Sequence, residues 1–343
     1  GEGLTRPELA VLLAYAKLTV HSDLLDTDVP DDPYLARELA AYFPPELRER
    51  FPEGIEQHRL RRDIIATRLS NAMINHGGPT CVARLADETG ATVGAIAKAF
   101  AAVRDGFGLN GLNEEIDALD GVVPGAVQLD LYGVVQDMLL DRSVWFLRNV
   151  DLRSSLDELV AHYAAGIAPV ETVLSGPVRE LLPEEARALH DARVAQWTQA
   201  GVPEGLARRI ARLPAVENAT DIVLIADRTK ASISDVAVTF FAVGLLFRLD
   251  RIFGAARTLS VTDYYDRLAL ERALTAFEIA VRRLTAEVIE AHGPGVNGVT
   301  AWAEARGEVV ERARTGVHEI AASGLSVSKL SVAASLIGDL VRG

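Results

Sequence analysis

Apolar residues recur along almost the whole chain three or four positions apart, the spacing of an α-helix. Strand patterns are scarce, and the best strand candidate, 222–226, follows the stretch 218–221, which is typical of a helix N-cap. The sequence therefore predicts an all-α protein, a bundle-like array of about a dozen helices with no significant sheet. The predicted spans are 5–26, 33–42, 57–76, 80–89, 92–106, 125–149, 155–174, 183–200, 203–212, 219–229, 233–257, 262–292, 298–322 and 327–341.

The first predicted helix begins with a complete set of start signals. Thr5 and Glu8 have the spacing of a capping box, in which the threonine oxygen accepts from an early helical amide and the glutamate accepts from the cap amide. Pro7 lies in the first turn, where its missing N–H costs nothing. Leu4 and Leu9 are spaced to form a hydrophobic staple around the cap. No methionine precedes this helix, and we expect the chain to be part of a longer polypeptide.

Two apolar stripes mark the last third of the chain. The first comprises Leu270, Leu274, Phe277, Val281, Leu284 and Val288. The second follows the loop 292–298 and comprises Trp302, Ala305, Val309, Ala313, Val317 and Ile320. Two long helices joined by a short loop are expected to pack antiparallel, as an internal hairpin. The alternative is that one stripe pairs with another subunit.

Proline and glycine separate the predicted helices, and no segment recurs with a fixed period. We place a candidate seam at 149–155, which divides the chain into candidate lobes 1–151 and 152–343. With 343 residues, 49% of them hydrophobic, the chain has enough apolar side chains for a large core.

Charge and cysteine content narrow the class of protein. The net charge of −13 disfavours nucleic acid and anionic membranes as partners. The longest apolar run, 236–247, is too short to span a bilayer and predicts a buried helix. The single cysteine, Cys81, allows no disulfide within the chain, which is typical of a reducing cytosol.

Two stretches, 106–111 and 293–298, match the dinucleotide-binding pattern G-x-G-x-x-G. The pattern holds a pyrophosphate only between a strand and a helix of a βαβ unit. Each stretch here follows a predicted helix and has no strand signal nearby, so we interpret the glycines as helix caps and turns. We expect neither stretch to bind a cofactor.

The remaining reactive side chains form no pattern typical of catalysis. No two of the seven histidines have the spacing that places metal ligands on one helix face. Cys81 follows a turn and is expected to be a small buried apolar residue. The sequence therefore assigns no catalytic, cofactor-binding or metal-binding residue.

One segment, 58–78, combines several arginines with an apolar helix face. Arg68, Asn71 and Asn75 follow Leu60 and Ile64 at helical spacing and share their face. One interpretation is an internal hydrogen-bond network, because half-buried polar groups need partners. The other is a surface for docking another domain or a small anion. The candidate docking or effector face comprises Arg61, Arg62, Arg68, Asn71 and Asn75.

Several ordered stretches together resemble a known family. They are GLTRPELAVLLAYAK at 3–17, YFPPELRERF at 42–51, HRLRRDIIATRLSNAMINHGG at 58–78, QDMLLDRSVWFLRN at 136–149 and, less distinctively, SISDVAVTFFAVGLLFRLD at 232–250. In this order they resemble the C-terminal helical region of the large bacterial NAD-specific glutamate dehydrogenases. The resemblance covers most of the chain and is densest over 3–150.

The resemblance implies a parent enzyme that oxidises L-glutamate to 2-oxoglutarate and ammonium and passes a hydride to NAD⁺. It implies that the active-site lysines and the NAD site belong to an upstream catalytic domain with a Rossmann fold, which this sequence lacks. It also implies a cytoplasmic homo-oligomer. No catalytic residue is carried over, and no cofactor is expected in this region.

These observations lead to two main hypotheses. The first is a non-catalytic C-terminal module that serves as a scaffold and as an interdomain or subunit contact. The second is a ligand-sensing regulatory module that binds an anionic effector or an amino acid at the face around Arg68. A free-standing helical enzyme is the least favoured, because no spacing gathers titratable groups in one place.

Overall fold

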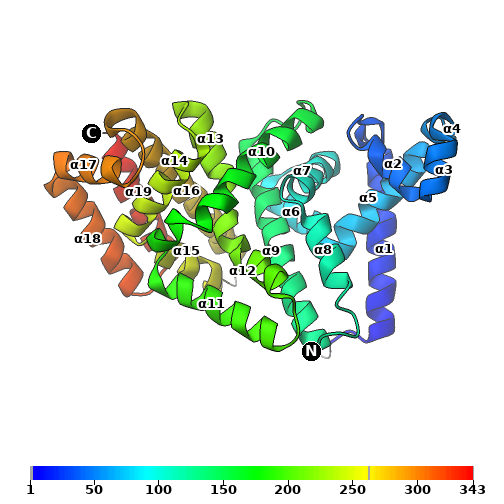
Figure 1. The fold of residues 1–343 in the computed structure, drawn as a ribbon, viewed down its shortest axis with the longest axis horizontal. Helices are drawn as coiled ribbons and strands as arrows, with labels where there is room; N and C mark the ends of the chain where they lie inside the picture. The colour runs from blue at the N-terminus through cyan, green and yellow to red at the C-terminus, as the bar shows by residue number, and fades with distance from the viewer. Residues whose placement is uncertain (1–2, 262, 343) are drawn as a thin grey trace. The chain divides into compact units, whose positions relative to one another are not determined.

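The computed structural model describes residues 3–261 and 263–342 (Figure 1). These ranges contain nineteen α-helices, two short 3₁₀ helices and no β-strand, which confirms the all-α prediction. The helices form two compact units, Gly1–Ala164 and Ala165–Gly343. The assignment of 1–151 and 152–343 as separate lobes stays a prediction.

The first unit contains nine whole helices and part of a tenth. They are α1 (Arg6–Leu25), α2 (Ala36–Tyr42), α3 (Pro45–Arg50), α4 (Pro52–Glu56), α5 (Arg61–Gly77), α6 (Cys81–Thr89), α7 (Val93–Gly106), α8 (Leu109–Asp117) and α9 (Gly125–Asn149), with the 3₁₀ helix η1 (Val29–Asp31). The helix α10 (Leu156–Leu174) crosses from this unit into the next.

The second unit contains the remaining described helices. They are α11 (Glu184–Gln199), α12 (Glu204–Val216), α13 (Ala219–Thr229), α14 (Ile233–Phe247), α15 (Leu249–Thr258), α16 (Tyr264–His292), α17 (Val296–Arg306), α18 (Glu308–Ala322) and α19 (Val327–Arg342), with the 3₁₀ helix η2 (Pro177–Leu181).

The core of the first unit is built on α5, α7 and α9. Ile65, Leu69 and Met73 of α5 are fully buried. The small side chains of α7 are buried along most of its length and allow α9 to pack closely against it. Phe146 of α9 meets Tyr163 of α10 edge to face, with the ring centroids 4.8 Å apart.

The long helix α16 is the centre of the second unit and packs against α13, α14, α17 and α19. Phe277, Leu284 and Val288 of its predicted stripe are completely buried. The stripe therefore forms part of this unit's own core, as the internal interpretation expected.

The start signals at the beginning of the chain form the predicted capping box. Thr5 is the N-cap of α1, and its backbone N–H donates to Glu8 Oε2 at 2.7 Å. Leu4 before α1 and the first half of α1, including Leu9, are exposed, whereas Leu24 near its end is completely buried.

Several predicted helix boundaries are wrong because proline and glycine begin helices here as well as end them. No helix was predicted over 43–56, but Pro45 and Pro52 occupy the first positions of α3 and α4. The helix α8 also lies in a predicted loop, and Gly108 is its N-cap.

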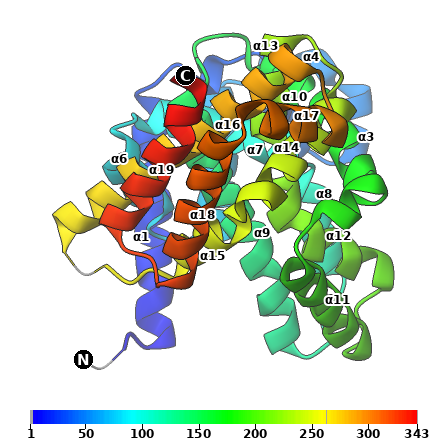
Figure 2. The same cartoon turned by 90° about the vertical axis from the view of Figure 1, so that its left-hand side faces the viewer.

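Two predicted helices are divided by residues with positive φ. Arg248, with a φ of 53°, separates α14 from α15, and Gly307, with a φ of 46°, separates α17 from α18. The predicted hairpin of two long helices is therefore wrong. The helix α19 packs along α16, while α18 packs on α19 (Figure 2). The break shifts the second stripe, so that Val310 is buried and Val309 is exposed.

Candidate functional site

The predicted docking or effector face lies on α5, which packs against α1, α2, η1 and α9. The apolar side chains of α5 fill this packing. Two of its arginines, Arg62 and Arg68, extend to neighbouring elements of the same unit.

Arg62 closes the C-terminal end of α1. Its Nη2 donates to the carbonyl oxygens of Leu25 at 2.8 Å and Thr27 at 3.1 Å, and its guanidinium forms an ion pair with Asp31 of η1. The last carbonyls of a helix lack intrahelical partners, and a cation there also interacts favourably with the helix dipole. Arg62 therefore joins α5 to the chain that leaves α1.

Arg68 joins a buried ionic network between α2 and α7. Its Nε donates to Glu38 Oε2 at 3.1 Å. Glu38 is only 6% exposed, and its other oxygen accepts from Arg104 Nη2 at 2.7 Å. Arg104 also donates to both oxygens of Asp105, at 2.8 and 2.9 Å.

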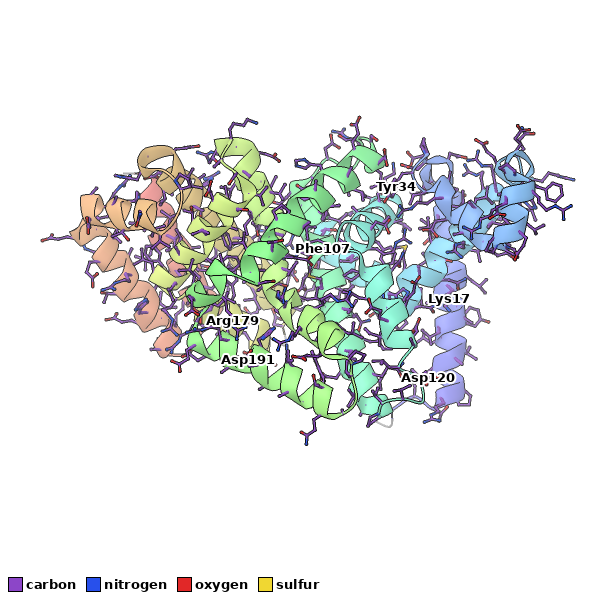
Figure 3. All side chains as sticks on the ribbon, viewed as in Figure 1. Lys17, Tyr34, Phe107, Asp120, Arg179 and Asp191 are labelled. Atoms are coloured by element: carbon purple, nitrogen blue, oxygen red, sulfur yellow. The ribbon has the colours of Figure 1, made fainter. Side chains whose placement is uncertain are left out.

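The same Asp105 carboxylate accepts from two side chains of the segment around α2. The Tyr34 hydroxyl, labelled in Figure 3, donates to Asp105 Oδ2 at 3.1 Å, and Arg37 pairs with the same oxygen. Burial and the Asp105 charge both raise the pKa of Tyr34 above its ordinary value. Burial alone would lower the pKa of Arg104, but Asp105 and Glu38 raise it, so the guanidinium stays charged.

This ionic network, made of Tyr34, Arg37, Glu38, Arg68, Arg104 and Asp105, is satisfied within the first unit. Both carboxylates accept from guanidinium groups of the same unit. The sequence analysis missed Glu38, Arg104 and Asp105. A signal was present, because the adjacent charges of Arg104 and Asp105 closely follow the alanine-rich stretch 95–102.

Arg68 is the one predicted residue in this network, and Arg61, Asn71 and Asn75 also lie outside the contacts of Arg62. Arg61 is half-buried, and its Nε has no hydrogen-bond partner among the described residues. Asn71 is half-buried and Asn75 is exposed. The structure thus brings Arg62 and Arg68 into internal contacts, and the use of the whole face by an effector stays a prediction.

The two G-x-G-x-x-G stretches serve as helix caps. Gly108, with a φ of 63°, is the N-cap of α8. Gly293 ends α16, and Gly295, with a φ of 89°, is the N-cap of α17. Each stretch joins two helices, so neither forms the strand–turn–helix that positions a dinucleotide.

The cysteine and one histidine have shifted pKa values because they are buried. Burial raises the pKa of the Cys81 thiol to about 11, which disfavours the reactive thiolate. Burial lowers the pKa of His76 on the last turn of α5, and the charge of Asp117 opposes this shift in part. Cys81 is buried as predicted, and neither group has the environment of an activated nucleophile or base.

Other kinds of site were sought among the described residues. No three histidine, cysteine, aspartate or glutamate side chains lie close enough there to hold a metal ion. No single helix of residues 3–261 and 263–342 is long and apolar enough to cross a membrane. The pair α13 and α14 meets the length and composition together, but the two helices are bent by 116° at their junction.

Comparison with known proteins identifies the family. The chain matches the family model "Glutamate dehydrogenase, C-terminal" over residues 1–339. It is 35% identical to the NAD-specific glutamate dehydrogenase of Pseudomonas aeruginosa over 100% of this chain and 21% of that protein. Identity to the NAD-specific glutamate dehydrogenase of Halomonas elongata is 34%, over 85% of this chain and 18% of that protein. Identity to the protein of the same name from Mycobacterium tuberculosis is 30%, over 100% of this chain and 21% of that protein.

The chain spans about a fifth of the length of the curated relatives that it matches. The family match nevertheless extends over nearly all of its residues, from the capped first helix to the last turns of α19. The chain therefore belongs to the glutamate dehydrogenase C-terminal family.

Proposed function

We propose that the chain is the non-catalytic C-terminal helical module of a NAD-dependent glutamate dehydrogenase. The parent reaction converts L-glutamate, NAD⁺ and water to 2-oxoglutarate, ammonium and NADH. The module acts as a scaffold that contacts the upstream catalytic domain of the same polypeptide and helps the subunits of a cytoplasmic homo-oligomer to associate. The catalytic domain binds NAD, and the module binds neither nucleic acid nor membrane.

The observation that carries the proposal is the ionic network of the first unit. Catalytic acids and bases need a pKa and a position suited to proton exchange with a substrate. Glu38 and Asp105 instead accept from arginines of α2, α5 and α7 and hold these helices together. Charged side chains used in this way support a structural role.

The relatives support the identity of the parent enzyme. Each of the three carries the name NAD-specific glutamate dehydrogenase, and each is about five times as long as the aligned region. Most of such a protein lies outside the region matched here, which leaves room for a complete catalytic domain.

The test compares three proteins in an assay of glutamate-dependent NADH formation: the full-length parent, the parent truncated before residue 1, and residues 1–343 alone. We expect turnover by the full-length protein and none by residues 1–343. We also expect truncation to lower the melting temperature or the oligomeric mass of the parent. Turnover by residues 1–343 would refute the non-catalytic role, and truncation without effect on stability or mass would refute the scaffold role.

A second candidate function is the sensing of an anion at the docking or effector face. The specific observation is Arg61, whose buried Nε has no hydrogen-bond partner among the described residues. An anion held there would give this donor a hydrogen-bond acceptor, while Arg62 and Arg68 on the same helix keep their internal partners.

Thermal unfolding tests this candidate with glutamate, 2-oxoglutarate, other amino acids and nucleotides as probes. A ligand that binds the folded state raises the melting temperature as its concentration increases. The variant Arg61→Met should abolish the shift, whereas Arg59→Met, at an exposed neighbouring position, should keep it. A panel without any shift would exclude these ligands as effectors.

A further inference from the structure

The helix α1 has apolar side chains on two opposite sides. One side faces the first unit and includes the buried residues Val20 and Leu24. Val11 and Tyr15 lie nine residues before them, which is two and a half helical turns and therefore the opposite side. Leu18 continues this second side at helical spacing.

The second side is exposed over its whole length. The exposed fractions are 55% for Val11, 66% for Tyr15 and 63% for Leu18. Leu12, which is 43% exposed, widens this surface toward the start of the helix. A helix that is apolar all round is normally buried all round, and a contiguous patch of large apolar side chains marks an interaction site.

The chain stabilises this helix without covering the exposed side. The capping box of Thr5 and Glu8 satisfies the first turn, and Arg62 closes the other end. Glu8 is the charged residue nearest to the exposed side. Its carboxylate accepts hydrogen bonds from the backbone N–H and the hydroxyl group of Thr5. The helix thus presents a formed apolar surface, which lowers the entropic cost of docking.

We propose that the α1 surface, defined as Val11, Leu12, Tyr15 and Leu18, docks onto the part of the same polypeptide that precedes residue 1. This inference rests on the proposed function. The matched family describes a C-terminal region, and about four fifths of each relative lies outside the alignment. The partner surface is apolar and belongs to the catalytic part of the parent enzyme.

Two considerations favour this occupant over a second copy of the module. A covalently connected partner has a high effective concentration next to the first helix, so docking costs no second association. A second copy would bring another net charge of −13 close to this chain, which opposes association.

The test places a photo-crosslinking amino acid, p-benzoylphenylalanine, at position 15 of the full-length enzyme. The control has the same group at Leu189 of α11, which is 55% exposed and has the charged residues Glu185 and Arg193 one turn away on either side. We expect position 15 to crosslink to a peptide that precedes residue 1, within a product of unchanged denatured mass. Position 189 should give no such product.

Other crosslinking results would overturn the inference. A product of doubled mass would assign the α1 surface to a second chain. A crosslink to residues 165–343 would assign it to the second unit. Absence of any crosslink, or an equal yield from position 189, would show that the surface has no specific occupant in the enzyme.

Hydrogen exchange in the full-length enzyme provides a second measurement. The triple variant Val11→Gln, Tyr15→Gln, Leu18→Gln should increase exchange of the α1 amides by about tenfold or more, because docking buries several apolar side chains. Leu189→Gln should leave exchange of these amides unchanged. Unchanged exchange in the triple variant would contradict docking.

The assay of glutamate-dependent NADH formation on the same preparation separates the two proposals. A wild-type enzyme without turnover would refute the parent activity, whereas the position of the crosslink decides the docking surface independently.

Discussion

The helices α1 and α16 have similar apolar periodicity, but the structure uses them differently. The stripe of α16 is buried in its own unit, with Phe277 and Leu284 completely inaccessible. On α1 the side that carries Tyr15 and Leu18 is exposed. The comparison teaches that periodicity locates a helix and its apolar face, whereas the partner of that face depends on tertiary structure.

The two helices are also held in place by different interactions. Apolar burial along most of its length holds α16. Only the end of α1 is held, by the burial of Val20 and Leu24 and by the contacts of Arg62. Substitutions on the two helices should therefore have effects of different size and kind.

The largest expected effect comes from removing a core side chain of α16. Phe277 is completely buried, and its ring lies 5.2 Å from that of Phe253 between centroids. Phe277→Ala should lower the free energy of unfolding of the second unit by about 3–5 kcal/mol. Urea unfolding followed by tryptophan fluorescence in a Trp145→Phe background measures this loss of stability, because the remaining tryptophans, Trp197 and Trp302, both lie in the second unit.

The control for this prediction is Tyr265→Ala on the same helix, where the side chain is 75% exposed. It should change the free energy of unfolding by less than about 0.5 kcal/mol. Equal losses from the two variants would contradict the view that α16 is stabilised by its buried stripe.

The next effect concerns the end of α1. Arg62→Met removes two hydrogen bonds to carbonyls and the ion pair with Asp31. Because Arg62 is partly exposed, we expect a cost of about 1–2 kcal/mol, and faster hydrogen exchange in the last turn of α1. Arg59→Met, at an exposed position, is the control. If Arg62→Met exchanges no faster than this control, the carbonyl contacts do not hold α1.

Much of the fold could be predicted from local sequence signals. The spans 125–149 and 219–229 were predicted with the boundaries that α9 and α13 have. These helices have strong periodicity, and start signals stand directly before them, Pro124 for α9 and Asn218 for α13. The division at Arg248 could not be predicted, because a left-handed arginine has no local signature and is stabilised by its tertiary setting.

The candidate site could likewise be predicted only in part from local sequence signals. The sequence could group Arg61, Arg62 and Arg68 because they lie on one helix. It could not show that Glu38 and Arg104, from two other helices, complete a network with Arg68. Pairings between distant segments follow from packing, which local patterns do not encode.

A smaller effect is expected on how the stability of the first unit depends on pH. The pKa of His76 is lowered in the folded first unit, so the unfolded state binds more protons in the range below about 6.5. The contribution of His76 to stability is complete above that pH and is lost as the pH falls toward the lowered pKa. His76→Gln should therefore flatten the decrease in the stability of the first unit below about pH 6.5.

Fluorescence of Trp145, the tryptophan of the first unit, measures this response in a Trp197→Phe, Trp302→Phe background. Urea unfolding at several pH values gives the difference between His76 and His76→Gln. A constant difference across the range would show that His76 does not titrate differently on folding.

The smallest effect is expected on the exposed side of α1, and it is the sharpest test of the comparison. In residues 1–343 alone, Tyr15→Gln should change the free energy of unfolding of the first unit by less than about 0.5 kcal/mol, because the side chain is 66% exposed. In the full-length enzyme the same change should accelerate exchange of the α1 amides, because there the side chain is buried in the docked surface. If Tyr15→Gln already lowers the free energy of unfolding of residues 1–343, then α1 completes its packing within its own unit, as α16 does. If the change has no effect in either protein, the α1 surface has no partner.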